Sequence, residues 1–210
     1  MGKESTVRNI NSLYDRFILW LMGTAFAAMF TLLSFSRRER ATHENGIAAA
    51  GRVKIVDNPD FPAHESFRPG REFPCRLRHT TIGFMDDAVL EVRSASLKFA
   101  DAEYKSPLDL EMNSGEFPPT PNAYRFWQFA MATARGRYLE YARYFQQFPR
   151  GLEPAQTGVR RNPETFAHIR YYTQTVFHFK AQDGKTRFVK YRLAPANPSL
   201  DAGLHDDKEV

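Results

Sequence analysis

The most prominent feature in the pattern of apolar and polar residues is one long apolar stretch near the N-terminus. Residues 17–35 contain no charged side chain, and charges stand on both sides, with Asp15 and Arg16 before them and Arg37 and Arg38 after them. Nineteen helical residues rise about 28 Å, which is close to the thickness of the hydrocarbon core of a bilayer. We therefore expect a single transmembrane helix over residues 17–35.

Two other interpretations of this apolar stretch fit the sequence less well. A cleavable signal peptide would need a small-residue site after the apolar run, but Ala25-Phe26-Ala27 is a poor site and lies inside it. A buried core helix is less favoured because it would have to hide a long segment without any polar side. The basic cluster of Arg37, Arg38 and Arg40 places the C-terminal flank on the inner, positive side of the membrane.

Alternating positions after the apolar stretch predict four strands, over residues 51–56, 73–82, 89–99 and 111–117. Helical spacing follows over residues 122–148, where Gly136 separates two helices. Residues 162–164, Asn-Pro-Glu, have the cap and first-turn pattern that starts a helix, which we expect over residues 166–171.

The chain ends in a predicted β-hairpin and a polar tail. Residues 175–180 and 186–193 alternate around Asp183-Gly184, which is a strong hairpin signal. The order of the predicted elements, which is strands, then helices, then a hairpin, indicates an α+β fold. We expect an antiparallel, barrel-like sheet with a helical insertion. The expected organisation is an N-terminal segment (residues 1–16), the transmembrane helix (17–35), one domain (40–195) and the tail (196–210).

Composition narrows the classes of partner. The formal net charge of +5 over 210 residues is a modest basic bias that is spread along the chain. We see no basic array interleaved with aromatic residues, and we therefore expect no nucleic-acid partner. Cys75 is the one cysteine, which excludes an internal disulfide and a Cys-rich metal site, and we expect it to be a small buried hydrophobe.

His43 and Asn113 are the candidate residues for chemistry. His43 lies between the apolar stretch and Gly46, and Asn113 ends the string Asp109 to Asn113. A histidine accepts and returns a proton near neutral pH, and an asparagine amide donates hydrogen bonds. Taken alone, His43 fits a linker histidine in solvent and Asn113 fits a turn residue, so the residues by themselves leave both interpretations open.

Five strings, in this order, resemble the haem catalase superfamily. They are Ala-Thr-His-Glu-Asn-Gly at 41–46, Leu-Arg-His-Thr-Thr at 77–81, the stretch 92–99 that ends in Leu-Lys-Phe, Asp-Leu-Glu-Met-Asn at 109–113, and the hairpin at 177–192. The resemblance covers roughly residues 40–193 and implies a catalase-type domain. It also implies that His43 and Asn113 face the distal side of a haem, and that Arg78 and Arg93 contact it, Arg78 at a propionate.

Thr42 directs the resemblance to one branch of the superfamily. Catalases usually carry valine before the distal histidine, and Thr42 looks more like the catalase-related allene oxide synthases, which rearrange fatty-acid hydroperoxides. The resemblance therefore adds Thr42 to His43 and Asn113 as candidate catalytic residues.

The family's proximal tyrosine has no counterpart in these 210 residues, because Tyr171 and Tyr172 fall near a barrel strand. We therefore expect a truncated catalase-type domain without bound haem, acting as a non-catalytic accessory subunit of a membrane complex in the mitochondrial inner membrane. The alternative is half of a split haem enzyme, in which another chain supplies the tyrosine for haem b and the substrate is hydrogen peroxide or a fatty-acid hydroperoxide. A third interpretation is haem or lipid binding without catalysis. No other metal site is expected.

Overall fold

The computed structural model describes residues 13–38, 40, 42–43, 45–81, 91–100, 106–134, 138–160 and 164–200. The chain divides into two compact units, residues 1–41 and residues 42–210. Each unit is described by itself.

The described residues of the first unit form one helix, α1 (Leu13–Arg37), of 25 residues. Its segment Leu13–Ser36, which contains the uncharged residues 17–35, is long and apolar enough to cross a membrane, and none of it is buried. The predicted apolar helix is therefore confirmed and begins four residues earlier than expected, at Leu13. Length and composition also suit a signal sequence, so the membrane crossing itself stays a prediction.

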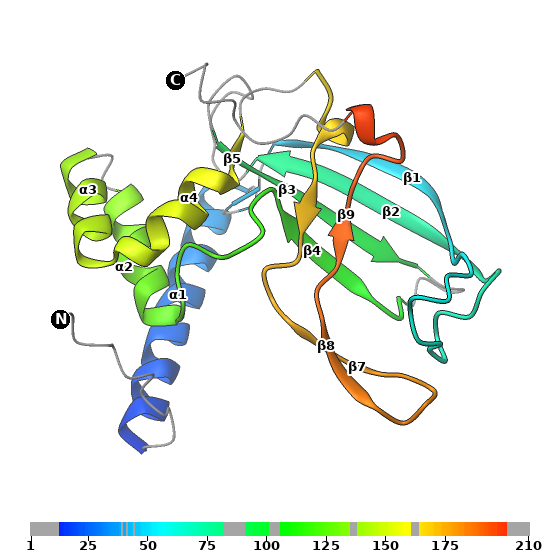
Figure 1. Ribbon diagram of the computed structural model, residues 1–210. Coiled ribbons are helices and arrows are strands. Elements are labelled where there is room, and N and C mark those ends of the chain that lie inside the picture. The colour runs from blue at the N-terminus through cyan, green and yellow to red at the C-terminus, as the bar shows by residue number, and fades with distance from the viewer. Residues whose placement is uncertain are drawn as a thin grey trace. The chain divides into compact units, whose positions relative to one another are not determined.

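The second unit is built on an antiparallel sheet of seven strands (Figure 1). The hydrogen-bonded order is β1-β2-β3-β4-β6-β9, and β5 pairs with the start of β3. The bounds are β1 (Gly46–Lys54), β2 (Glu72–Thr81), β3 (Glu91–Phe99), β4 (Asp109–Asn113), β5 (Val159–Arg160), β6 (Tyr171–Tyr172) and β9 (Arg192–Leu193).

The sheet curls, and β6 and β9 come round in front of the longer strands (Figure 1). Among the described residues the path begins at β1 and ends at β9, so the sheet is an open half-barrel. The predicted α+β class with an antiparallel, barrel-like sheet is confirmed in this form. A separate hairpin joins β7 (Phe177–Lys180) to β8 (Thr186–Val189), with Phe177 opposite Val189.

The helical insertion lies between β4 and β5 in the chain. It consists of α2 (Ala123–Ala134), α3 (Tyr138–Gln147), a 3-10 turn η2 (Pro149–Gly151) and α4 (Leu152–Gly158). The helices share an aromatic cluster, in which the rings of Phe129 and Tyr144 are 5.5 Å apart and those of Tyr141 and Phe145 are 4.8 Å apart. The predicted helical stretch is thus confirmed as two helices, although Gly136 itself lies outside the described residues.

The two faces of the sheet differ in chemistry, because side chains alternate along each strand. One face carries the core, formed by Ala95, Leu110, Met112, Ile169 and Tyr171. Cross-strand partners share a face, so the registers place Ser94, Ser96, Glu111 and Asn113 together on the opposite, polar face. This polar face is where the candidate residues collect.

Several predicted bounds were wrong. β1 starts at Gly46, because its apolar residues Ile47 to Ala50 pair with β2 although they show no alternation of polarity. β4 is Asp109–Asn113 and does not extend to residue 117. The helix expected over 166–171 is only the 3-10 turn η3 (Phe166–His168), since Tyr171 pairs with Leu193 in the sheet.

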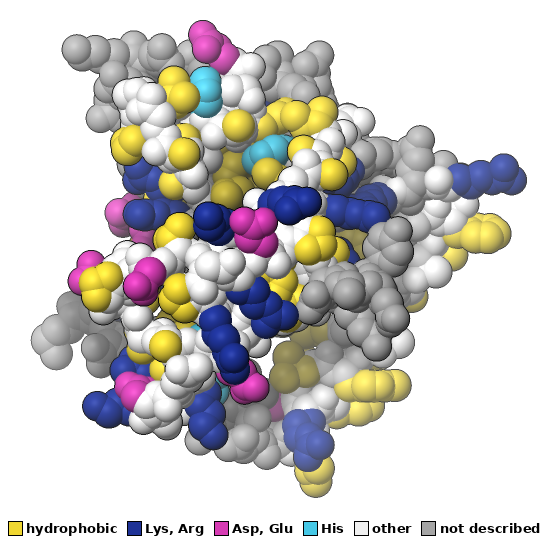
Figure 2. Space-filling model, turned by 90° about the vertical axis from the view of Figure 1, so that its right-hand side faces the viewer, with side chains coloured by type: hydrophobic (Ala, Val, Ile, Leu, Met, Phe, Trp, Pro, Cys, Tyr) yellow, Lys and Arg dark blue, Asp and Glu magenta, His cyan; other side chains and the backbone are white. Residues whose placement is uncertain are grey.

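Some predictions lie outside the described residues. They concern residues 1–12, the helix start at 162–163, residues 82–90 and the tail from 201 onward; within 196–200 a short 3-10 turn, η4 (Pro198–Leu200), is described. On the face that Figure 2 shows, Lys and Arg side chains are spread among acidic and apolar ones. That distribution agrees with a modest net charge that is not concentrated in blocks.

Candidate functional site

His43 enters the second unit in an unusual backbone conformation. Its φ is +57°, in the left-handed region that few residues other than glycine adopt. The Arg78 guanidinium donates a hydrogen bond of 2.8 Å from Nη2 to the His43 carbonyl oxygen. This charged hydrogen bond supports a conformation that would otherwise cost about 1–3 kcal/mol.

Gly46 brings the backbone after His43 close to β2. It pairs with Thr80, and a Cβ at this position would collide with the His79 carbonyl oxygen and lie 2.6 Å from Cγ2 of Thr80. Only glycine therefore permits this approach. The close pairing fixes the chain three residues after His43 and sets where its ring meets the sheet.

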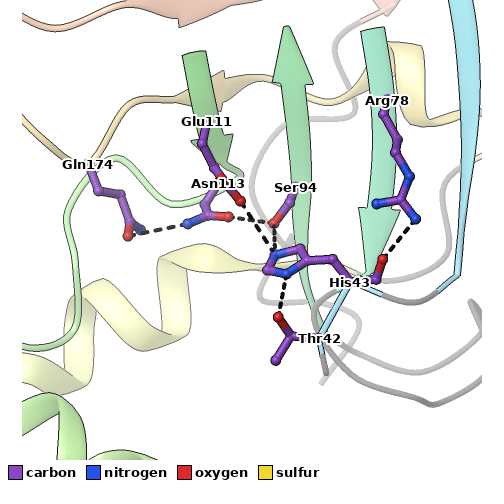
Figure 3. A network of polar contacts seen from close by, with 7 residues as sticks. All are labelled: Thr42, His43, Arg78, Ser94, Glu111, Asn113 and Gln174. Carbon is purple, nitrogen blue, oxygen red and sulfur yellow. Dashed lines mark hydrogen bonds and ion pairs between the residues drawn. The ribbon is translucent and has the colours of Figure 1, made fainter. Parts of the chain in front are cut away.

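The His43 ring lies in a polar network (Figure 3). Nδ1 is 3.0 Å from Oγ1 of Thr42, and Nε2 is 3.3 Å from Oγ of Ser94. Nε2 also lies 3.9 Å from Oε1 of Glu111, whose side chain is mostly exposed. The His43 side chain is 25% exposed, so a small molecule can reach the ring.

Asn113 joins the same network through Ser94. Ser94 is fully buried, and its hydroxyl donates to Oδ1 of Asn113 at 2.5 Å. Asn113 Nδ2 donates to Oε1 of Gln174 at 3.3 Å, and Gln174 Nε2 donates to the carbonyl oxygens of Gly115 and Phe117, both at 3.4 Å. The two predicted distal residues, 70 positions apart in sequence, are thus linked by a single serine.

Strand register explains why these residues meet. Gly46 is paired with Thr80, Thr80 with Ser94, Ser94 with Asn113, and Asn113 with Tyr172. All five positions form one row across the sheet. The row brings residues from five strands to one line on the polar face.

Arg78 and Arg93 have different surroundings. Arg78 is half-buried beside His43, where it holds the backbone carbonyl described above. Arg93 is fully buried on the opposite face, with its guanidinium carbon 5.8 Å from the centre of the Phe166 ring. Its backbone N–H donates to Oγ of Ser114 at 3.0 Å. The structure therefore brings Thr42, His43, Asn113 and Arg78 together and does not bring Arg93 to them.

Sequence reasoning missed Ser94, Glu111 and Gln174. Glu111 had a usable signal, because it stands two residues before Asn113 in a strand and so shares its face. Ser94 and Gln174 carried no such local signal. Their proximity follows only from the pairing of β3 with β4 and of β4 with β6.

Two groups outside this cluster have structural roles. Burial lowers the pKa of His79, which stacks against Phe166 at 6.0 Å and lies 5.2 Å from the Tyr171 ring on the core face. Tyr171 is fully buried and its hydroxyl donates to the Phe166 carbonyl oxygen at 2.9 Å. Across the part of the chain that the structure describes, no cluster of three or more His, Cys, Asp or Glu side chains could hold a metal ion.

Cys75 is half-buried in β2, and burial raises the pKa of its thiol. A thiol with a raised pKa carries little thiolate near neutral pH and is a poor nucleophile. The expectation that Cys75 is a packing residue agrees with these surroundings.

Comparison with known proteins gives both sequence and fold relatives. The chain is 40% identical over 179 residues to an "Allene oxide synthase-lipoxygenase protein" of Plexaura homomalla, over 83% of this chain and 16% of the relative. It is 30% identical over 194 residues to a "Linolenate 9R-lipoxygenase" of Nostoc sp., over 86% of this chain and 23% of the relative. The chain therefore spans less than a quarter of either relative. No protein-family model matches.

Two solved structures share the fold. A bacterial catalase superposes with a TM-score of 0.61 at 19% identity, over 91% of this chain and 38% of the catalase. A fungal catalase superposes with a TM-score of 0.55 at 20% identity, over 80% of this chain and 37% of the catalase. Identities this low show the shared fold alone.

Proposed function

The chain has a catalase-type fold and is homologous to part of an allene oxide synthase-lipoxygenase protein, which confirms the predicted resemblance, and on this premise we propose a haem-dependent function for it. The domain supplies the distal face of a site that acts on fatty-acid hydroperoxides. The supporting observation is the serine-bridged contact between His43 and Asn113. His43 and Asn113, each a weak signal in the sequence, therefore belong to one site in the structure.

The side chains on the polar face fit the distal side of a haem. An imidazole and a primary amide, both partly accessible, belong to one network and have fixed partners. A bound haem would supply the iron at which the O–O bond of a hydroperoxide is cleaved. We assign no axial ligand among the described residues, and the proposal requires a tyrosine from another chain or from a further segment.

His43 and Asn113 then have separate roles. His43 takes the hydroperoxide proton and returns it, which is the usual general acid–base role of an imidazole. Asn113 gives one hydrogen of Nδ2 to Gln174, and its second hydrogen is available to hold an oxygen of the substrate. Arg78 acts indirectly, because its hydrogen bond holds the His43 backbone.

The membrane anchor is a second part of the proposal. α1 is uncharged over residues 17–35, none of that stretch is buried, and basic Arg38 and Arg40 follow the helix. A helix of this kind keeps the domain at a bilayer, where fatty-acid hydroperoxides arise. The comparisons carry no support for an accessory subunit of a membrane complex, and that function, with its mitochondrial location, stays a prediction.

Absorbance spectroscopy and a hydroperoxide assay test the proposal. The full chain is isolated in mild detergent with its natural partners and mixed with a fatty-acid hydroperoxide, and we expect a haem absorbance band and consumption of the substrate. His43→Gln should abolish consumption while the haem band remains. The matched control is His178→Gln, which changes an exposed histidine on β7 and should have no effect.

The outcomes separate the two functions. A folded, membrane-bound complex that contains no haem and takes up none from added haemin contradicts the enzymatic proposal. The same result supports the accessory-subunit alternative. Consumption that survives His43→Gln would show that the polar face is not the reacting site.

A further inference from the structure

The network around His43 ends at two groups that can only accept hydrogen bonds. Gln174 lies between Asn113 and the backbone carbonyl oxygens of Gly115 and Phe117, at 3.4 Å from each. A carbonyl oxygen has no hydrogen to give, so Gln174 must turn its amide nitrogen toward them. Its other atom, Oε1, therefore faces Asn113 and can only accept.

This orientation determines every hydrogen bond that follows. Asn113 must present Nδ2 to Gln174, which leaves Oδ1 facing Ser94. The Ser94 hydroxyl must then donate to Oδ1, and its oxygen is left to accept from Nε2 of His43 at 3.3 Å. A neutral histidine carries one ring proton, so Nε2 holds the proton and Nδ1 is a bare acceptor.

The groups around the ring agree with this assignment. Glu111 places a carboxylate oxygen 3.9 Å from Nε2, which favours a hydrogen on that nitrogen. Thr42 places a hydroxyl 3.0 Å from Nδ1, which can donate to a bare nitrogen. Among the described residues, Arg78 is a further charged group beside His43. It binds the backbone oxygen and not a ring nitrogen, so it does not favour either tautomer.

We propose that Gln174 and Ser94 are positioning residues that fix the proton of neutral His43 on Nε2 and leave Nδ1 as its base. Three hydrogen bonds, through Asn113 and Ser94, connect Gln174 to the His43 ring. The proton taken from a substrate then arrives at Nδ1, beside the Thr42 hydroxyl, which can turn from donor to acceptor when His43 becomes charged. This catalytic consequence rests on the proposed function, whereas the tautomer itself does not.

Nitrogen NMR on the haem-free full chain in detergent micelles, labelled with ¹⁵N-histidine, tests the inference directly. The two ring nitrogens of a neutral histidine have different shifts when one is protonated and the other is bare. The His43 signals are identified by their loss in His43→Gln. We expect Nε2–H in the wild-type chain and a Nε2 proton that exchanges slowly with water.

Variants decide whether the network sets the tautomer, because a free imidazole also favours Nε2–H. Ser94→Ala removes the acceptor of the Nε2 proton. Gln174→Leu lets Asn113 turn and present Nδ2 to Ser94, whose hydroxyl is then free to donate to Nε2. In both we expect the Nδ1–H population to rise about fivefold, the ratio that corresponds to about 1 kcal/mol for one hydrogen bond.

Matched controls separate positioning from general damage. Ser96→Ala changes a serine on the same strand and the same face, and should leave the His43 signals unchanged. Ser94→Thr keeps a hydroxyl and should restore the wild-type tautomer. Unchanged signals from His79, which is buried on the core face of the same sheet, show that each variant is folded.

Two results would overturn the inference. One is a wild-type chain in which Nδ1–H dominates, a measurement that needs no variant to fold. The other is a Gln174→Leu variant that behaves like Ser96→Ala. Neither result depends on haem or turnover, so the inference can fail while the proposed function holds, and the reverse.

Discussion

Substitution of Gly46 by alanine tests how the site is held against the sheet. The new Cβ meets the His79 carbonyl oxygen and lies 2.6 Å from Cγ2 of Thr80, and a backbone oxygen cannot move aside without disturbing the β1–β2 pairing. Overpacking of this kind costs about 1–3 kcal/mol. For a domain of this size, that corresponds to a decrease of about 2–12 °C in Tm.

Gly51→Ala is the matched control within the same strand. A Cβ at Gly51 would be 3.6 Å from Sγ of Cys75, which is an ordinary van der Waals contact. Replacing a glycine without strain restricts the unfolded chain and stabilises by about 0.4–1 kcal/mol. The two alanine variants should therefore shift stability in opposite directions.

Thermal unfolding of the full chain in detergent, followed by near-UV circular dichroism, provides the assay. Because Gly46 fixes the strand start beside His43, the alanine variant should also lose the slow exchange of the His43 Nε2 proton. Equal Tm values for the two variants would refute the steric argument. A destabilised Gly46→Ala that keeps the His43 signal would refute the link between this contact and the site.

Three further predictions concern other parts of the chain. Burial lowers the pKa of His79, so the unfolded state binds its proton first and stability falls as pH decreases below about 6.5; His79→Phe should flatten this dependence in denaturant titrations across that range. The Arg187 side chain lowers the pKa of Asp183 to about 2, so its stabilisation of the β7–β8 turn is complete above about pH 4 and is lost as pH falls toward 2. NMR shifts of the turn should follow that window, and Asp183→Asn should remove it. Ala27→Arg places a charge in the apolar stretch of α1 at a cost of about 2.5–3.5 kcal/mol and should release the protein from membranes in alkaline carbonate extraction, whereas Ala27→Leu should not.

Much of the fold could be predicted from periodicity, and the errors have physical causes. β2, whose residues alternate from Phe73 onward, was predicted to within a residue, and the hairpin around Gly184 has the expected turn glycine at φ +76°. β1 was predicted too short because Ala48 to Ala50 have no polarity to alternate, and their strand conformation comes from pairing with β2.

The candidate site, like the fold, could be predicted from the sequence only in part. His43 and Asn113 were found by their order in the sequence and their resemblance to a family. Ser94, which connects them, could not be found, because a serine in a strand has no distinguishing local pattern. Its role depends on the β3–β4 register, a long-range property that a single sequence does not reveal.

The serine repeat in β3 has a consequence for folding errors. Ser94 and Ser96 stand two residues apart, so a slip of β3 by two residues against β4 would place another serine opposite Asn113 and keep the polar and apolar faces intact. A one-residue slip, in contrast, would exchange the two faces and expose Ala95 and Leu97 where the serines now lie. Chains trapped in the two-residue slip would retain strand content and a serine beside Asn113, yet the contacts of β3 with β2, including Leu97 opposite Leu77, would be displaced. A measurement of secondary-structure content would not distinguish such misregistered molecules from the native protein. Only an altered environment of the site residues would reveal them.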